Sequence, residues 1–221
     1  MRLSWKQEMF GAIVLVAMAL VVIYYYPLLP DPMPSHFDMR WNVDGWMRKD
    51  SFLILMGLTL ILPYLLFTFL PFVDPLRNKI EPRFKTVLLI RDVLLVFLSI
   101  LLFLILKGAT EGKLNPNMMM VALGFLFILL GNYMPKFPQN WFIGIRTPWT
   151  MSSEVVWRKT HILGGWLFIL SGAVFIVYGL LNIGSIVPFA IIIFTALFSV
   201  VYSFYVFKKV EKQGKTERDK S

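Results

Sequence analysis

The chain has 221 residues, of which 57% are apolar and 16% charged, with a formal net charge of +9 and no cysteine. A soluble domain is about half apolar and a quarter charged, so this balance indicates a membrane protein. The absence of cysteine excludes disulfides, cysteine-based zinc sites and thiol catalysis.

Apolar stretches recur along the whole chain, each close to the roughly 20 residues that a helix needs to cross a bilayer. They cover residues 10–29, 52–73, 86–106, 117–134, 162–183 and 186–207. Because backbone groups in lipid must be satisfied within the segment, helices are expected rather than strands. The sequence therefore predicts an all-α polytopic membrane bundle of six transmembrane helices.

Basic residues distribute unevenly between the predicted loops, and the excess is expected on the cytoplasmic side. Most of the 22 Lys and Arg residues fall on the side that carries both termini. The other side holds only Arg40, Arg48, Lys49, Lys107 and Lys113. We therefore predict an N-in/C-in topology in the cell membrane. Basic charge confined to short loops and a tail suits lipid headgroups, so no direct nucleic-acid contact is predicted.

Three regions are expected along the chain. Residues 1–80 form a two-span module whose outer loop covers 30–51, and residues 81–207 form a four-span region whose cytoplasmic loop covers 135–160. Residues 208–221 are a basic cytoplasmic tail without apolar periodicity, expected to be a frayed helix end followed by disorder.

The outer loop begins with three prolines within residues 30–34, which favour extended backbone. Its polar and aromatic candidates are His36, Asp38, Trp41, Asp44 and Trp46. The histidine and two aspartates are candidates for a ligand or metal site, although their spacing matches no metal motif. Alternatively the loop is a compact turn with its tryptophans at headgroup level, or a docking surface for an extracellular peptide.

The loop between the fourth and fifth stretches is a polar and aromatic island in an apolar chain. Its candidate partner-binding or interfacial residues are Asn132, Asn140, Arg146, Thr147, Trp149, Glu154, Trp157 and His161. An arginine among apolar neighbours requires carboxylates, phosphates or carbonyls, and Glu154 or a lipid phosphate is the expected partner of Arg146. Asn132 is expected to bond a freed carbonyl or a facing helix.

This island has a structural and a functional interpretation. It is either an interfacial loop held down by one arginine, or a cytoplasmic docking site for a protein or small ligand. Trp157 and His161 are four residues apart and should share one helix face. Gly164 and Gly165 allow close approach of a neighbouring helix.

Ionisable residues are scarce inside the spans. Arg91 and Asp92 are the intramembrane pair, close enough to one end for the arginine to snorkel. The chain contains two histidines, and neither a nucleophile elbow nor an HExxH motif occurs. We therefore predict no enzymatic activity, no catalytic residue, no cofactor and no metal.

The amino-acid sequence of the island resembles the signature of the SdpI-like family of bacterial multi-pass membrane proteins. The resemblance rests on Gly131-Asn132-x-Met134, on the run Asn140-x-x-Ile143-Gly144-Ile145-Arg146-Thr147-Pro148-Trp149-Thr150, and on Glu154-x-x-Trp157, Thr160-His161 and Gly164. It covers roughly residues 115 to 205. The first half, with residues 30–50, resembles a module of unknown function often found ahead of that region.

The resemblance implies immunity against an extracellular peptide toxin, as in the family member that protects against the sporulation-delaying killing factor. It also implies signal transduction, in which a cytoplasmic repressor protein is drawn to the membrane. The alternative is a transporter or exporter of an amphipathic peptide or small molecule, with a path lined by Arg91, Asp92, Asn132 and Ser171.

Overall fold

The computed structural model describes residues 1, 3–38, 42–184 and 186–218. Its longer helices are α1 (Trp5–Tyr25), α2 (Lys49–Val73), α4 (Phe84–Glu111), α5 (Pro116–Tyr133), α7 (Glu154–Leu181) and α8 (Ile186–Arg218). Short helices are α3 (Arg77–Ile80) and α6 (Pro148–Ser152), with 3-10 turns η1 (Tyr26–Leu28), η2 (Glu81–Arg83) and η3 (Met134–Lys136). The strands are β1 (Met33–Phe37) and β2 (Val43–Met47).

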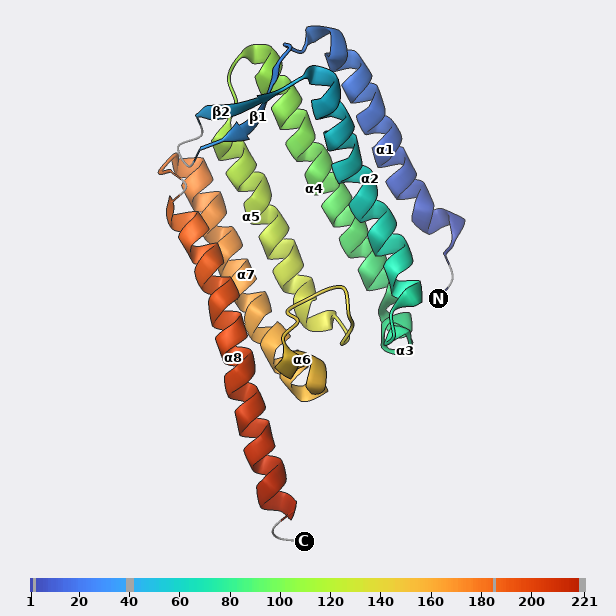
Figure 1. Cartoon of the computed structure of the whole chain (residues 1–221), viewed down its shortest axis with the longest axis vertical. Helices are drawn as coiled ribbons and strands as arrows, with labels where there is room; N and C mark the ends of the chain where they lie inside the picture. Colours follow the sequence, from blue (N-terminus) through green and yellow to red (C-terminus); the bar gives the residue numbers. More distant parts are fainter. Residues whose placement is uncertain (2, 39–41, 185, 219–221) are drawn as a thin grey trace.

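Six of the helices within the described residues are long and apolar enough to cross a membrane, as the sequence predicted. They run roughly alongside one another, and both ends of the chain lie toward the same end of the bundle (Figure 1). The protein is therefore a multi-pass membrane protein. We call the end with β1 and β2 the hairpin end, and the end with α3 and α6 the tail end.

A two-stranded antiparallel sheet covers part of the hairpin end (Figure 1). Met33 pairs with Met47 and Pro34 with Trp46, with an irregular register beyond them. The prolines did predict extended backbone, but the pairing of the two strands was not predicted. Gly45 makes the pairing possible, because a Cβ there would lie 2.8 Å from Cβ of His36.

The helices form two groups of three, α1 with α2 and α4, and α5 with α7 and α8 (Figure 1). In the first group a buried cluster includes Met18, Phe52, Leu60, Leu95 and Leu102. It continues through Met33 into the hairpin. The sequence assigned α4 to the second region, whereas its packing partners include α1 and α2; the boundary at residue 80 stays a prediction.

Glycines bring α5 and α7 into backbone contact. A Cβ on Gly131 would lie 2.5 Å from the carbonyl oxygen of Gly165, and one on Gly124 would lie 2.6 Å from that of Gly172. The glycines are seven residues apart on each helix, so they fall on one face. Such close approach is the usual way in which helices associate in lipid, where apolar surface alone provides no driving force. The predicted close approach at Gly165 is thus confirmed.

The end of the chain differs from its prediction. α8 continues as a helix through Arg218, so residues 208–218 are an ordered extension and not only a frayed end. It projects beyond the other helices at the tail end (Figure 1). Lys208 bonds Glu211 one turn later, with 3.2 Å between nitrogen and oxygen, which is a pairing expected on an exposed helix.

Candidate functional site

The 135–160 loop is shaped first by Asn140. Its side-chain oxygen accepts hydrogen bonds from the backbone of Phe142 (2.9 Å) and Ile143 (2.7 Å), and its amide donates to the carbonyls of Pro138 (2.9 Å) and Ile143 (3.0 Å). The side chain is buried, and all of its polar atoms are satisfied. Asn140 therefore fixes a tight turn and offers no free group to a ligand.

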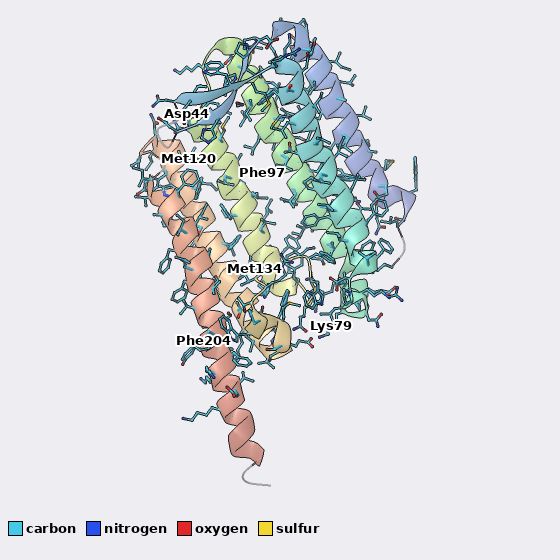
Figure 2. All side chains as sticks on the ribbon, in the orientation of Figure 1. Asp44, Lys79, Phe97, Met120, Met134 and Phe204 are labelled. Carbon is cyan, nitrogen blue, oxygen red and sulfur yellow. The ribbon has the colours of Figure 1, made fainter. Side chains whose placement is uncertain are left out.

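The segment between α2 and α4 holds the loop from one side. Asp74, buried at the end of α2, accepts from the backbone of Leu76 at 2.7 Å and of Trp141 at 2.8 Å. Lys79 of α3 donates to Gln139 at 2.9 Å and pairs with Glu154 at 3.1 Å; its position beside the loop is labelled in Figure 2. The loop thus joins the two groups of helices at the tail end.

Thr147 starts α6 and attaches it to α8. Its hydroxyl accepts from the backbone of Thr150 at 3.1 Å, and the backbone of Thr147 donates to the Thr150 hydroxyl at 2.8 Å, a reciprocal cap. The hydroxyl of Thr147 also lies 3.0 Å from the hydroxyl of Ser203 on α8. Trp149 packs on Phe204 with ring centroids 5.0 Å apart (Phe204 is labelled in Figure 2).

Trp157 and His161 share one face of α7, as predicted, and their rings stack, with centroids 4.0 Å apart and planes 21° from parallel. The indole donates to the carbonyl of Phe137 at 2.9 Å. Nε2 of His161 accepts from the backbone of Ile145 at 3.0 Å, and Nδ1 lies 2.8 Å from the Trp157 carbonyl. These partners require a neutral imidazole with its proton on Nδ1. Both side chains are buried, which makes them supports of the loop.

Of the two partners predicted for Arg146, Glu154 was wrong, and a lipid phosphate stays a prediction. The guanidinium of Arg146 donates to the carbonyl of Trp141 in the same loop, whereas Glu154 pairs with Lys79. A carbonyl five residues away satisfies one donor without any carboxylate, and Arg146 remains exposed. Trp141 is 51% exposed and Phe142 37% exposed, so the loop presents an aromatic and cationic surface beside its buried supports.

Asn132 was also assigned wrongly. It is exposed on α5, and no side-chain hydrogen bond joins it to the rest of the described chain. Gly131, one residue earlier, occupies the contact with α7 instead. A rotation of about 100° per residue places neighbouring positions on different faces of a helix.

At the hairpin end the three candidate ligands do not converge. Nδ1 of His36 lies 2.5 Å from a carboxylate oxygen of Asp44, and both side chains are exposed (Asp44 is labelled in Figure 2). Asp38 instead accepts from Asn42, at 2.8 Å from its backbone and 2.9 Å from its amide. Among the described residues no three His, Asp or Glu side chains form a metal-binding group.

The hairpin presents one described tryptophan. Trp46 is 59% exposed, and Trp41 lies outside the described residues. Lys49 at the start of α2 donates through its backbone to Asp31 at 3.2 Å, and Asp50 accepts from the Tyr26 hydroxyl at 2.9 Å. These bonds attach the hairpin to α1 and α2.

Arg91 lies at the centre of a buried ion cluster, 1% exposed. Nη1 lies 2.9 Å from both carboxylate oxygens of Glu8 and from the hydroxyl of Thr68, and Nε lies 2.9 Å from Asp92. The Tyr64 ring packs against the guanidinium at 4.5 Å. The arginine therefore does not snorkel to the interface; its partners lie on three helices within the bundle.

Sequence reasoning missed Glu8, Asp74, Lys79 and Gln139. The first two had a usable signal, since each is an isolated acid at the end of an apolar run, where it is costly unless paired. Lys79 and Gln139 had none, because the bond between them joins residues 60 positions apart in the sequence. Ser171, proposed as part of a transport path, bonds Thr195 of α8 at 3.0 Å, so it is not brought near Arg91 and Asp92.

Comparison with known proteins gives matches over most of the chain. Residues 136–204 match the SdpI/YfhL protein family, and residues 13–62 match a domain of unknown function, DUF1648. The chain is 23% identical over 211 residues to the immunity protein SdpI of Bacillus subtilis (strain 168), covering 93% of this chain and 98% of that protein. No solved structure matches the chain.

The two matched segments follow the architecture. The first covers most of α1, the hairpin and the first half of α2, and the second covers the 135–160 loop, α7 and most of α8. The predicted resemblance to the SdpI-like family, with a module of unknown function ahead of it, is thereby confirmed.

Proposed function

We propose that this protein confers immunity to an extracellular peptide toxin. The observation that carries the proposal is the similarity to the immunity protein SdpI over nearly the full length of both chains. At 23% identity the toxin itself can differ. The exposed Trp46 of the hairpin supports the proposal, because tryptophan is enriched at protein interfaces, and the exposed His36 and Asp44 beside it can hydrogen-bond a peptide.

The immunity test compares strains with and without the gene. Cells lacking it should be killed by a membrane-active peptide at concentrations that cells carrying it survive, and Trp46→Ala should reduce survival while the protein still accumulates in the membrane. Trp166→Ala is the matched control, because Trp166 is equally exposed at 64% but lies on α7. Equal sensitivity of both strains across a panel of such peptides would refute immunity.

The proposal places the hairpin end outside the cell and the tail end in the cytoplasm. The excess of Lys and Arg at the tail end supports this orientation. A reporter fused after residue 220 should be inaccessible from outside, and a tag between residues 38 and 42 should be accessible. The opposite labelling pattern would reverse the assignment of both surfaces.

A second step of the proposed function is recruitment of a cytoplasmic repressor protein by the 135–160 loop. The exposed Trp141, Phe142 and Arg146 support it, since such residues dominate protein interfaces. Trp141→Ala and Arg146→Ala should release a fluorescently tagged repressor from the membrane without lowering the amount of membrane protein. Normal recruitment by both variants would refute this step and would show that the loop has a structural role only.

We further propose that the protein acts without catalysis. The buried polar side chains of the 135–160 loop, namely Gln139, Asn140, Thr147 and Thr150, bond within the chain, as does His161 next to it. General acid–base or nucleophilic chemistry needs a titratable group that can reach a substrate. Purified protein should therefore leave a toxin peptide intact in mass spectrometry under conditions in which immunity is observed.

A further inference from the structure

A groove of about 480 Å³ opens between α4 and α5. Its walls are apolar side chains, among them Val93, Val96, Phe97, Ala122 and Phe125. Phe97, labelled in Figure 2, lies on α4. This volume falls within the roughly 300–1,000 Å³ of small-molecule sites.

One charged residue, Asp92, lines the groove. Its side chain is 19% exposed, and the hydrogen bond from Arg91 reaches only Oδ1. Glu8 differs, because both of its oxygens accept from Arg91 and one also accepts from the Tyr64 hydroxyl at 2.6 Å. A carboxylate accepts about four hydrogen bonds, so Asp92 retains capacity that Glu8 has largely used.

The cluster sets one basic group against two acidic ones. The carboxyl groups of Glu8 and Asp92 face the single guanidinium of Arg91. All three residues lie in membrane-spanning segments, where a charge without a partner is costly. A cation bound at Asp92 would give the second carboxyl group a partner of its own.

Asp92 can be reached from water as well as from the groove. It also lines a more polar pocket of about 600 Å³ at the tail end, together with Ser4, Gln7 and Lys85. Lys85 is exposed and lies two helical turns away from Asp92 along α4. The carboxylate thus stands where an apolar groove meets a polar opening, an arrangement that suits an amphiphile.

The length of the groove suits a single hydrocarbon chain. Its lining on α4 runs from Leu89 to Ile100, about 16 Å at 1.5 Å per residue. One extended chain can lie along this distance with apolar side chains on both sides.

We propose that this groove binds a cationic amphiphile, with one hydrocarbon chain between α4 and α5 and a protonated amine at Asp92. The apolar walls contribute affinity without regard to charge, and the free oxygen of Asp92 selects the amine over a neutral or anionic headgroup. Arg91 holds the carboxyl group of Asp92 in place through the bond to Oδ1, so it is a positioning residue. The site is separate from the hairpin and loop surfaces of the proposed function.

The test is direct binding of radiolabelled dodecylamine to the full-length protein in a neutral detergent. We expect one molecule per chain, displaced by unlabelled dodecylamine at concentrations roughly tenfold or more below those of dodecanol, because a charge-assisted bond is lost with the alcohol. Asp92→Asn should abolish this preference. Dodecanol competing equally with the amine, or dodecyl sulfate competing better, would overturn the proposal.

A second variant keeps the test valid if Asp92→Asn does not accumulate. Ala122→Phe fills the groove from α5 and leaves the three ionised side chains unchanged, so dodecylamine binding should be lost. Ala190→Phe, on an exposed face of α8, is the matched control and should bind normally. Retained binding in Ala122→Phe would contradict the groove as the site. Because the readout is binding by purified protein, its result is independent of whether the protein confers immunity.

Discussion

The two groups of helices are held together by different interactions. In α1, α2 and α4, a buried guanidinium draws side chains from all three helices to one point. Between α5 and α7, the glycines place no side chain at the contact, so that the two backbones touch at Gly124–Gly172 and Gly131–Gly165. Both arrangements answer the same problem, because apolar surface gives no net attraction between helices in lipid.

The difference has consequences for function. In the first group the ion cluster lies toward the tail end, and a groove opens between α4 and α5, where the two groups meet. A glycine seam spreads contact along the whole helix pair and rigidifies it. The 135–160 loop is attached to the rigid pair through Trp157 and His161, and to the other group through Asp74 and Lys79.

The largest effect is expected from Arg91→Met. This substitution leaves Glu8 and Asp92 buried without a cation, and breaking a buried pair costs about 3–5 kcal/mol. The free energy of unfolding, measured by titrating dodecyl sulfate into neutral micelles, should fall by that amount. Arg48→Met at the exposed hairpin end is the control and should change little. A stable Arg91→Met would mean that the first group is held by packing alone.

The glycine seam is tested by Gly131→Ala. Its new Cβ would meet a backbone oxygen at 2.5 Å, which cannot rotate away, so α5 and α7 must separate. Overpacking of this kind costs about 1–3 kcal/mol, and the upper part of that range is expected here. Gly57→Ala on α2 has no heavy atom within 4 Å of its new Cβ and should be neutral or stabilising. Equal effects at both glycines would refute a specific seam.

The same contrast explains how far the sequence could lead. The spans, the common helix face of Trp157 and His161 and the close approach at Gly165 follow from local composition and helical spacing, and all are found. The Arg91–Asp92 pair is also found. For Arg146 a carboxylate was favoured, whereas the bond goes to the carbonyl of Trp141, and the bond from Arg91 to Glu8 spans 83 positions that local sequence does not connect. The Asp-Gly pair within residues 33–47, Asp44-Gly45, is typical of a turn, but it lies inside β2 and not between the two strands, so the pairing was not evident.

A smaller effect is expected at Gly144, where the loop packs against His161 and Trp157 of α7. Gly144 has φ of +114°, and a Cβ there would lie 2.4 Å from Nε2 of His161. The His161 side chain can move more easily than the backbone oxygen met at Gly131. Gly144→Ala should therefore lower the free energy of unfolding by about 1 kcal/mol more than the strain of a positive φ does by itself. Gly184→Ala supplies that reference, since Gly184 has φ of +100° in open space. Thermal unfolding of both variants, followed by tryptophan fluorescence, gives the difference.

The smallest effect is expected where the loop meets α3. Lys79 and Glu154 are 3.1 Å apart, but their side chains are 36% and 72% exposed, so water screens the pair. A double-mutant cycle with Lys79→Met and Glu154→Gln should give a coupling of about 0.2–1 kcal/mol. Lys79→Met alone should cost more than Glu154→Gln, because it also removes the donor to the buried Gln139. The reverse order would show that the ion pair, and not the bond to Gln139, joins the two groups at this end.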